Sequence, residues 1–279
     1  MAGIGFALRA LARQESLSAV VKASWHAAVI AAGPWLFTIF GLAAITAFTE
    51  MIAGSATLAT FRAVVIYAFA TSLVLTAPVT IVATRIMADH LWRRDTSAVP
   101  ALLIAALGLA LLATGPGVVA LVLFFHVPLR LAMALYAITS VVAMVWIALA
   151  FCGAVRDYVA ITGAFLVGLL FAVAGATAAA LAGFGASGMV WGFLTGLIVT
   201  LIGLVFRVLA MFPTPVRDPI AAFKELIAGH STYKYLALGA LLGTAGIWVD
   251  KWVFWFSSEG QTVEGGLIHA PLYDSAMFI

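Results

Sequence analysis

The sequence predicts an all-α polytopic membrane protein, and its composition and its long uncharged runs carry this prediction. Of the 279 residues, 65% are hydrophobic and only 9% are charged, whereas about a quarter of the residues in a soluble domain are charged. The mean hydropathy is +1.18. Uncharged residues fall into runs that match the roughly 20 residues with which a helix crosses a bilayer core. We therefore expect a bundle of membrane-spanning helices.

The charged residues delimit seven predicted spans. Four uncharged gaps between charged residues hold one span each, at 23–49, 63–84, 96–129 and 131–155. The uncharged stretch from Ile161 to Phe206 is too long for one helix, and glycines at 183, 185 and 188 supply a turn that divides it. A seventh span covers Tyr235 to Phe256, and the final residues LYDSAMFI are typical of the start of an eighth helix.

The basic residues predict the orientation of these spans. With the amino terminus in the cytoplasm, 11 Lys and Arg residues fall inside and two, Arg62 and Arg130, fall outside. An excess of Lys and Arg in cytoplasmic loops is the general rule for multi-pass proteins. The predicted cytoplasmic set is Arg9, Arg13, Lys22, Arg85, Arg93, Arg94, Arg156, Arg207, Arg217, Lys224 and Lys234.

Four segments are expected along the chain. Residues 1–22 carry apolar side chains at helical spacing, which indicates an amphipathic helix on the cytoplasmic interface or a solvated lead-in to the first span. A first lobe of six helices covers 23–209. The proline-containing segment 210–233, with the helical pattern AAFKELI, should be a cytoplasmic linker between lobes. Residues 234–279 would supply the first helix of a second lobe, an extracytoplasmic loop and the start of the next helix, as in a truncated chain.

Glycine and proline residues inside the predicted spans suggest bends. Gly33 and Pro34 in the first span, Pro78 in the second and Pro116 in the third should kink or end their helices, because proline donates no backbone hydrogen bond. Gly33 and Pro34 are the candidate bend that could matter for transport. The alternative is that both residue types are simply common in membrane helices. Small residues in AVAGATAAALAG, 172–183, should allow two helices to approach closely.

Adjacent opposite charges occur in the seventh span, within GIWVDKWVFWF at 246–256. Asp250 would lie roughly 22 Å along a helix that starts at Tyr235, in the outer third of the membrane. Lys251 could extend to the outer interface, with Trp252 and Trp255 as members of an aromatic belt. The shorter Asp250 side chain cannot reach as far, so we expect it to face the bundle interior or a watery cavity.

Neighbouring residues in a helix point about 100° apart, so Asp250 and Lys251 should each find a partner elsewhere. Trp248 and Trp255 share the helix face of Lys251 and could contact its ammonium group by cation–π interactions. Aromatic rings would also suit contacts with sugar rings. The candidate residues of a substrate path are therefore Asp250, Lys251, Trp248, Trp252 and Trp255.

The sequence contains none of the residue patterns that are typical of metal sites, nucleotide-binding loops or catalytic nucleophiles. Its five histidines are dispersed without HExxH spacing, and its single cysteine, Cys152, cannot form a disulfide or a cysteine metal site within the chain. There is no GxxxxGK[ST] phosphate loop and no nucleophile elbow. Scattered basic residues without interleaved aromatics do not suggest nucleic acid binding. We expect no metal, no cofactor and no enzymatic activity.

Several segments together resemble the Pel exopolysaccharide transporter family (PelG-type) of the multidrug/oligosaccharidyl-lipid/polysaccharide (MOP) flippase superfamily. They are MAGIGFALRALARQ, AAVIAAGPWLFTI, RIMADHLWRRD, AVRDY, GIWVDKWVFWFS and PLYDSAMF. The resemblance covers the whole chain, and MAGIGF and WVDKWVFWF are its most specific parts. It implies a transporter with two six-helix lobes and a central cavity that opens alternately to the two sides of the bacterial inner membrane.

The resemblance also implies a substrate and partners. The family is thought to move an amino-sugar-rich polysaccharide out of the cytoplasm, together with a cytoplasmic glycosyltransferase and membrane-bound partner subunits. It brings no agreed list of transport residues. The alternatives are a cation-coupled exporter of small molecules with the same fold, a noncatalytic membrane scaffold for a polysaccharide synthase, and a membrane-embedded enzyme, for which Asp89, His90, Asp95 and Asp157 are the cytoplasmic candidates.

Overall fold

The computed structural model describes residues 39–155, 158–263 and 265–276. The predictions for segment 1–22, for Gly33 and Pro34 and for the beginning of the first span lie outside these residues. Besides the helical stretch Ile39–Ala53, the structure contains α3 (Ser55–Trp92), the short 3-10 helix η1 (Thr96–Ala98), α4 (Val99–Phe125), α5 (Leu129–Val155), α6 (Tyr158–Leu181), α7 (Gly185–Met211), α8 (Pro219–Thr232), α9 (Lys234–Trp255), β1 (Gln261–Thr262), β2 (Ile268–His269) and α10 (Pro271–Ala276).

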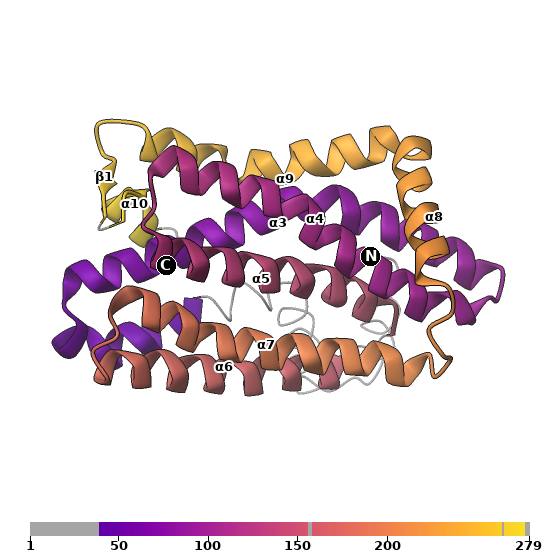
Figure 1. Ribbon diagram of the computed structural model, residues 1–279, viewed down its shortest axis with the longest axis horizontal. Coiled ribbons are helices and arrows are strands. Elements are labelled where there is room, and N and C mark those ends of the chain that lie inside the picture. The colour runs from indigo at the N-terminus through magenta and orange to yellow at the C-terminus, as the bar shows by residue number, and fades with distance from the viewer. Residues whose placement is uncertain (1–38, 156–157, 264, 277–279) are drawn as a thin grey trace, which may run out of the picture.

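Long apolar helices dominate the described part of the chain. Six of them are long and apolar enough to cross a membrane, and they correspond to the second to seventh predicted spans. They lie roughly side by side in Figure 1, with α6 and α7 along one edge of the bundle and α9 along the opposite edge. α5 lies between them and packs against α3, α4 and α7. The prediction of an all-α polytopic membrane protein is confirmed.

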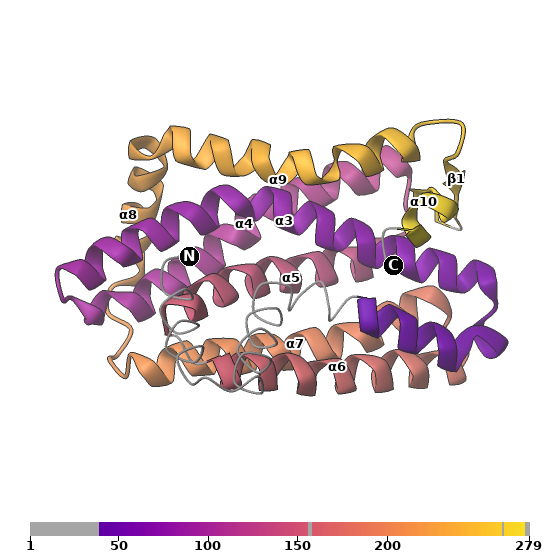
Figure 2. The ribbon, with the colours of Figure 1, turned by 180° about the vertical axis from the view of Figure 1, so that it is seen from behind.

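Two ends of the bundle differ in the elements that cover them. α8 crosses one end and connects α7 to α9, while β1, β2 and α10 lie at the other end; Figure 2 shows the same arrangement from behind. We call these the α8 end and the hairpin end. α8 begins after Asp218, whose carboxylate accepts a hydrogen bond from the backbone of Ala221 at 2.9 Å, and it packs against α3 and α4.

The prolines in the described spans lie within continuous helices, whereas two glycines form a turn between helices. We expected each of these prolines to kink or to end its helix. Pro78 lies inside α3 and Pro116 inside α4, so neither proline ends its helix. A proline removes one backbone donor, and packing in a membrane bundle can keep the helix continuous. The predicted turn between the fifth and sixth spans is confirmed, because Gly183 and Gly185 adopt positive φ values of 73° and 65° between α6 and α7.

Close packing of α6 against α7 depends on glycine. A Cβ atom at Gly175 would clash with the carbonyl oxygen of Gly192, and one at Gly196 would clash with that of Gly168. The predicted close approach of small residues in segment 172–183 is thus confirmed at Gly175. Such contacts let helix backbones approach in a membrane, where packing rather than hydrophobic burial holds helices together.

Candidate functional site

A buried ion pair joins α9 to α10 at the hairpin end. Lys251 Nζ lies 3.3 Å from Asp274 Oδ1, and the side chains are only 6% and 8% exposed. Asp274 also accepts hydrogen bonds from Trp255 Nε1, at 3.2 Å to Oδ2, and from the backbone N–H of Ala270, at 3.0 Å. The carboxylate is therefore surrounded by donors. We call Lys251, Trp255, Asp274 and the N–H of Ala270 the hairpin-end cluster.

Aromatic rings surround the ammonium group of Lys251. It lies 5.4 Å from the centre of the Tyr273 ring and 6.0 Å from that of Trp248, which is buried. These distances are within the range of cation–π contacts. The predicted contact with Trp248 is present, whereas Trp255 reaches the partner of the lysine by donating to Asp274.

The two adjacent charges of α9 are arranged in the opposite way to our expectation. Lys251 faces the bundle and is 5% exposed, while Asp250 is exposed. Because the two residues point in different directions along the helix, only one can face inward, and Asp274 supplies the opposite charge that makes burial of the lysine possible. Asp250 accepts hydrogen bonds from the Tyr273 hydroxyl and from the backbone of Lys251, the latter at 2.8 Å.

The loop after α9 is fixed to the bundle by its own contacts. Tyr67 of α3 donates a hydrogen bond of 2.9 Å to the carbonyl oxygen of Ile268, and its ring stacks on Trp255 with 4.4 Å between centroids. Gly266, at a φ of 87°, lies so close to the carbonyl oxygen of Phe125 that a Cβ atom would clash there. In this loop, burial lowers the pKa of His269 below its ordinary value.

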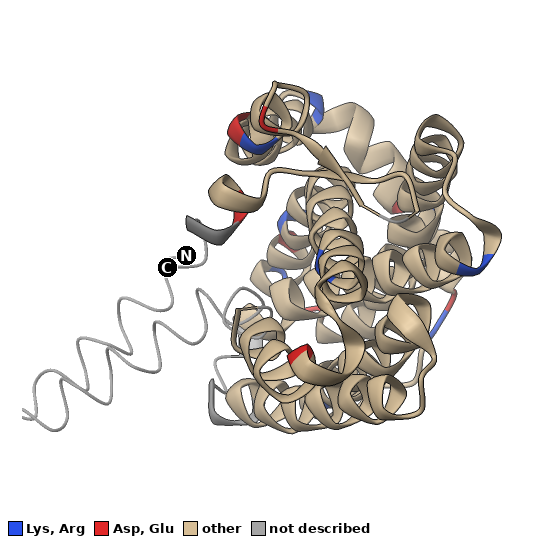
Figure 3. Cartoon of the chain, turned by 90° about the vertical axis from the view of Figure 1, so that its left-hand side faces the viewer, with Lys and Arg blue, Asp and Glu red and all other residues tan. Residues whose placement is uncertain are grey.

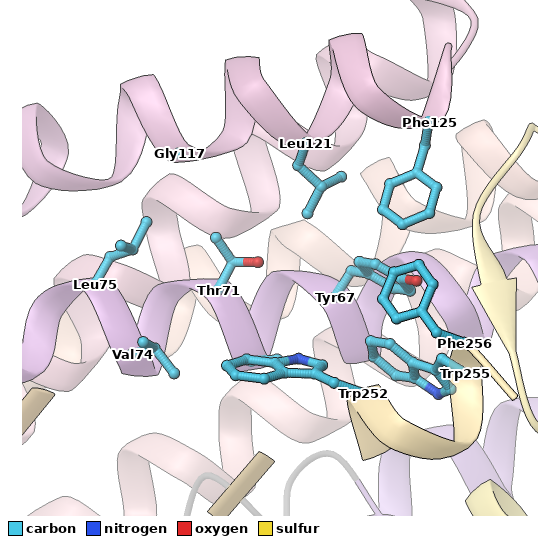
Figure 4. Close-up of a pocket in the computed structure, with 11 residues that line it drawn as sticks. Tyr67, Thr71, Val74, Leu75, Gly117, Leu121, Phe125, Trp252, Trp255 and Phe256 are labelled. Atoms are coloured by element: carbon cyan, nitrogen blue, oxygen red, sulfur yellow. The ribbon is translucent and has the colours of Figure 1, made fainter. Parts of the chain in front are cut away.

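An aromatic pocket of about 350 Å³ lies between α3, α4 and α9, beside the hairpin-end cluster. Its walls include Tyr67, Trp252, Trp255, Phe125 and Phe256. Figure 4 shows the indole of Trp252 lying along one side of the pocket, with the hydroxyl of a threonine of α3 above it. Few polar atoms line this space, so it suits apolar surfaces, including the C–H face of a sugar ring or the ring of an amphiphilic molecule.

A second group of polar side chains lies at the α8 end. Asp89 pairs with Arg85 at 3.2 Å and accepts a hydrogen bond of 3.1 Å from the hydroxyl of Tyr233. His90 Nε2 lies 3.0 Å from Glu225 of α8. We call Asp89, His90, Glu225 and Tyr233 the α8-end cluster. It connects α3 with α8 and with the residue that precedes α9.

The loop after α3 extends this group. His90 Nδ1 lies 3.4 Å from Asp95 Oδ2, and Ser97 donates a hydrogen bond of 2.7 Å to Asp95 Oδ1. The bond from Ser97 lowers the pKa of the Asp95 carboxyl, which favours its charged form. These acidic and basic side chains pair with one another, as at a solvated helix boundary. Within the described residues, no group of three or more His, Cys, Asp or Glu side chains could hold a metal ion.

One family model matches the chain over residues 1–279, and its description reads "PelG: Putative exopolysaccharide Exporter (EPS-E)". The chain belongs to the PelG family. The resemblance that the sequence segments indicated is thereby confirmed. No curated protein and no solved structure matches the chain. The family description concerns exopolysaccharide export, and it assigns no residue to a transport path.

In this PelG chain, sequence reasoning named the residues of α9 but missed their partners. Asp274, Tyr273 and Tyr67 come from α10 and α3, far from Lys251 in the sequence. One signal could have found Asp274: it is a carboxylate at the start of an apolar helix, which needs a positive partner in the same way as Lys251 needs a negative one. Gly33 and Pro34 lie outside the described residues, and their role stays a prediction.

Proposed function

We propose that this chain forms the membrane-spanning part of an exporter that moves an exopolysaccharide from the cytoplasm across the bacterial inner membrane. The observation that carries the proposal is the match of the PelG exporter family over residues 1–279. The six long apolar helices of the described residues fit a multi-pass transporter. Polymer translocation needs no covalent chemistry from this chain, and the exporter acts without enzymatic activity of its own.

The distribution of charge supports one orientation of the proposed exporter. Within the described residues, seven basic residues lie toward the α8 end, and three lie toward the hairpin end: Arg62, Arg130 and Lys251, which is buried and paired with Asp274. Figure 3, a view from the hairpin end, shows only scattered charged positions on the bundle. The excess of basic residues supports a cytoplasmic α8 end and an extracytoplasmic hairpin end. The basic residues toward the α8 end are Arg85, Arg93, Arg94, Arg207, Arg217, Lys224 and Lys234.

Transport would proceed by alternating access or in step with polymer synthesis. α3 contacts α9 and the hairpin loop at one end and α8 at the other, through two separate polar clusters. Breaking one cluster while keeping the other would let α9 move relative to α3 at one membrane face. α8, which joins α7 to α9, is the connection about which such a movement would occur.

The substrate of the proposed exporter is a polymer that carries free amino groups. The exposed carboxylates of Asp250 and Glu259 at the hairpin end would attract it where it leaves the protein. Aromatic side chains, Trp252 and Trp255 among them, would contact the sugar rings of the polymer without holding the polymer at one fixed position. A cytoplasmic glycosyltransferase and membrane partner subunits would deliver the polymer to the α8 end.

The proposal is tested by deleting the gene in its host and restoring it. Cells without the gene should stop secreting the polysaccharide, and the restored gene should return secretion. Secreted and cell-associated polymer are quantified separately, because the ratio of secreted to cell-associated polymer distinguishes a loss of export from a loss of synthesis. Normal secretion in the deletion strain would overturn the proposal. Resistance to cationic dyes, measured in the same strains, tests export of small molecules, which the largely apolar aromatic pocket favours as a second candidate function.

A further inference from the structure

A separate cleft lies on the outer surface of the hairpin end. Its volume is about 460 Å³, and Phe254, Glu259, Gln261, Leu272 and Tyr273 contribute to its walls. This volume is within the range of about 300–1,000 Å³ that is usual for small-molecule sites. The cleft combines residues from the end of α9, from the loop after it and from α10, and it is distinct from the aromatic pocket between α3, α4 and α9.

One wall of this cleft is aromatic and accessible. The rings of Phe254 and Tyr273 stack with centroids 4.1 Å apart and an angle of 18° between their planes. Phe254 is 38% exposed and Leu272 is 82% exposed, so an incoming molecule can contact this side. Aromatic rings favour the C–H groups of a sugar, and they also attract a positive charge at their faces.

The cleft also has polar groups, and the charged side chain among its lining residues, that of Glu259, is acidic. Glu259 and Gln261 are exposed and provide a carboxylate and an amide. None of the residues that the structure describes forms an ion pair with Glu259. The carboxylate of Asp250 lies next to the cleft, because it accepts a hydrogen bond from Tyr273. The nearby ammonium of Lys251 is already paired with Asp274, so it does not neutralise these carboxylates.

We propose that this cleft is an exit-side binding site for one positively charged sugar unit of the exported polymer. The sugar ring lies against Phe254 and Leu272, its ammonium group faces Glu259, and Gln261 bonds a hydroxyl group. The proposal rests on the proposed function, since it gives the exported polymer a specific site. A site for one unit, close to the helix end, would hold the polymer after each step and oppose its return.

The test measures binding of two matched oligosaccharides to the full chain in lipid nanodiscs. The probes are a tetramer of β-1,4-linked glucosamine and the same tetramer fully N-acetylated, so that only the positive charge differs. The glucosamine tetramer should bind, and the acetylated one should bind at least about tenfold more weakly, because a charge-assisted hydrogen bond is lost. Calorimetry at low and high salt should show that high salt weakens binding.

Three variants identify the cleft. Glu259→Gln should weaken binding of the glucosamine tetramer about tenfold, and Phe254→Ala should weaken binding of both tetramers. Glu50→Gln removes another exposed carboxylate, on the helical stretch Ile39–Ala53 outside the cleft, and should bind as the unchanged protein does. Equal binding of both tetramers, or equal affinity of the Glu259→Gln and Glu50→Gln variants, would overturn the proposal.

Export in cells separates this proposal from the proposed function. If deleting the gene leaves secretion intact, the exporter assignment fails, whatever the binding data show. If secretion needs the gene but Glu259→Gln neither weakens tetramer binding nor lowers the secreted fraction, only the exit-side site fails. Loss of a co-purifying partner in the Glu259→Gln variant, with unchanged tetramer binding, would show that the cleft is a protein interface instead.

Discussion

The two ends of the bundle use similar polar groups in different surroundings. At the hairpin end, the side chains of Lys251 and Asp274 are 6% and 8% exposed, whereas at the α8 end His90 is 15% and Glu225 is 45% exposed. A buried charge depends strongly on its partner because water cannot replace it, while an exposed pair exchanges its contact for water at little cost. The α8-end cluster should therefore open easily, and the hairpin-end cluster should open only when something else compensates its charges.

This difference bears on how an exporter could be closed on one side. In the proposed orientation the α8 end is at the cytoplasmic face, where a contact that costs little to break can open when a partner or substrate arrives. The hairpin-end cluster, in contrast, would hold the outer side closed until a charged group competes for Asp274 or Lys251. The exit-side cleft shares Tyr273 with the surroundings of this cluster, because that ring contacts both the Lys251 ammonium and the cleft. Substrate in the cleft could thus act on the closed state.

The largest effect is expected from Asp274→Asn. The substitution keeps the shape of the side chain but leaves the ammonium of Lys251 buried without its charged partner. Loss of one member of a buried pair costs about 3–5 kcal/mol, so the midpoint of thermal unfolding in detergent should fall strongly. Replacing both charges, as in Lys251→Met with Asp274→Leu, should recover much of this loss. An unchanged midpoint in Asp274→Asn would show that the pair is not needed for stability.

A smaller effect is expected from Tyr67→Phe. The variant keeps the ring that stacks on Trp255 but loses the hydrogen bond to the carbonyl oxygen of Ile268. A hydrogen bond of this kind contributes about 1 kcal/mol, and the hairpin loop should exchange its backbone hydrogens faster. Hydrogen exchange detected by mass spectrometry reports this on loop peptides. Tyr136→Phe, at a tyrosine that is 45% exposed on α5, is the matched control and should change nothing there.

The contrast between the ends also explains what could be predicted from the sequence. Long uncharged runs place the helices, because a bilayer selects length and apolarity, and the glycines at Gly183 and Gly185 mark the turn between α6 and α7. These are local properties. The basic residues that sort to the α8 end can likewise be counted without knowing any contact.

The arrangement of Asp250 and Lys251 could not be predicted in the same way. A general cost argument assigned the interior to the aspartate, because a short side chain cannot reach water easily. The outcome is reversed by Asp274, which belongs to a separate helix and supplies both the charge and the acceptor for Trp255. The β1–β2 hairpin was missed as well, since its strands have two residues each and depend on contacts with Tyr67 and Phe125.

At the α8 end, Glu225→Gln should have only a weak effect on stability. It removes the charge that faces His90 at a position that is 45% exposed, and exposed pairs contribute about 0.2–1 kcal/mol. The midpoint of thermal unfolding should shift by far less than in Asp274→Asn, and added salt should reduce even this shift because it screens exposed charges. A loss as large as that of Asp274→Asn would remove the distinction between the two ends.

The smallest effect concerns the response of the hairpin end to pH. Burial lowers the pKa of His269 in the folded protein below its unfolded value of about 6.5. The neutral ring is thus favoured by folding, and this contribution is complete above about pH 6.5 and is lost as the pH falls through the lowered pKa. Thermal unfolding followed from neutral to mildly acidic pH should show a decline that His269→Gln reduces. Arg62 lowers the pKa of His269 and Asp274 raises it. Arg62→Gln should therefore bring this pKa closer to its unfolded value and make the decline smaller, and identical profiles in all three proteins would contradict a partly buried histidine at this end.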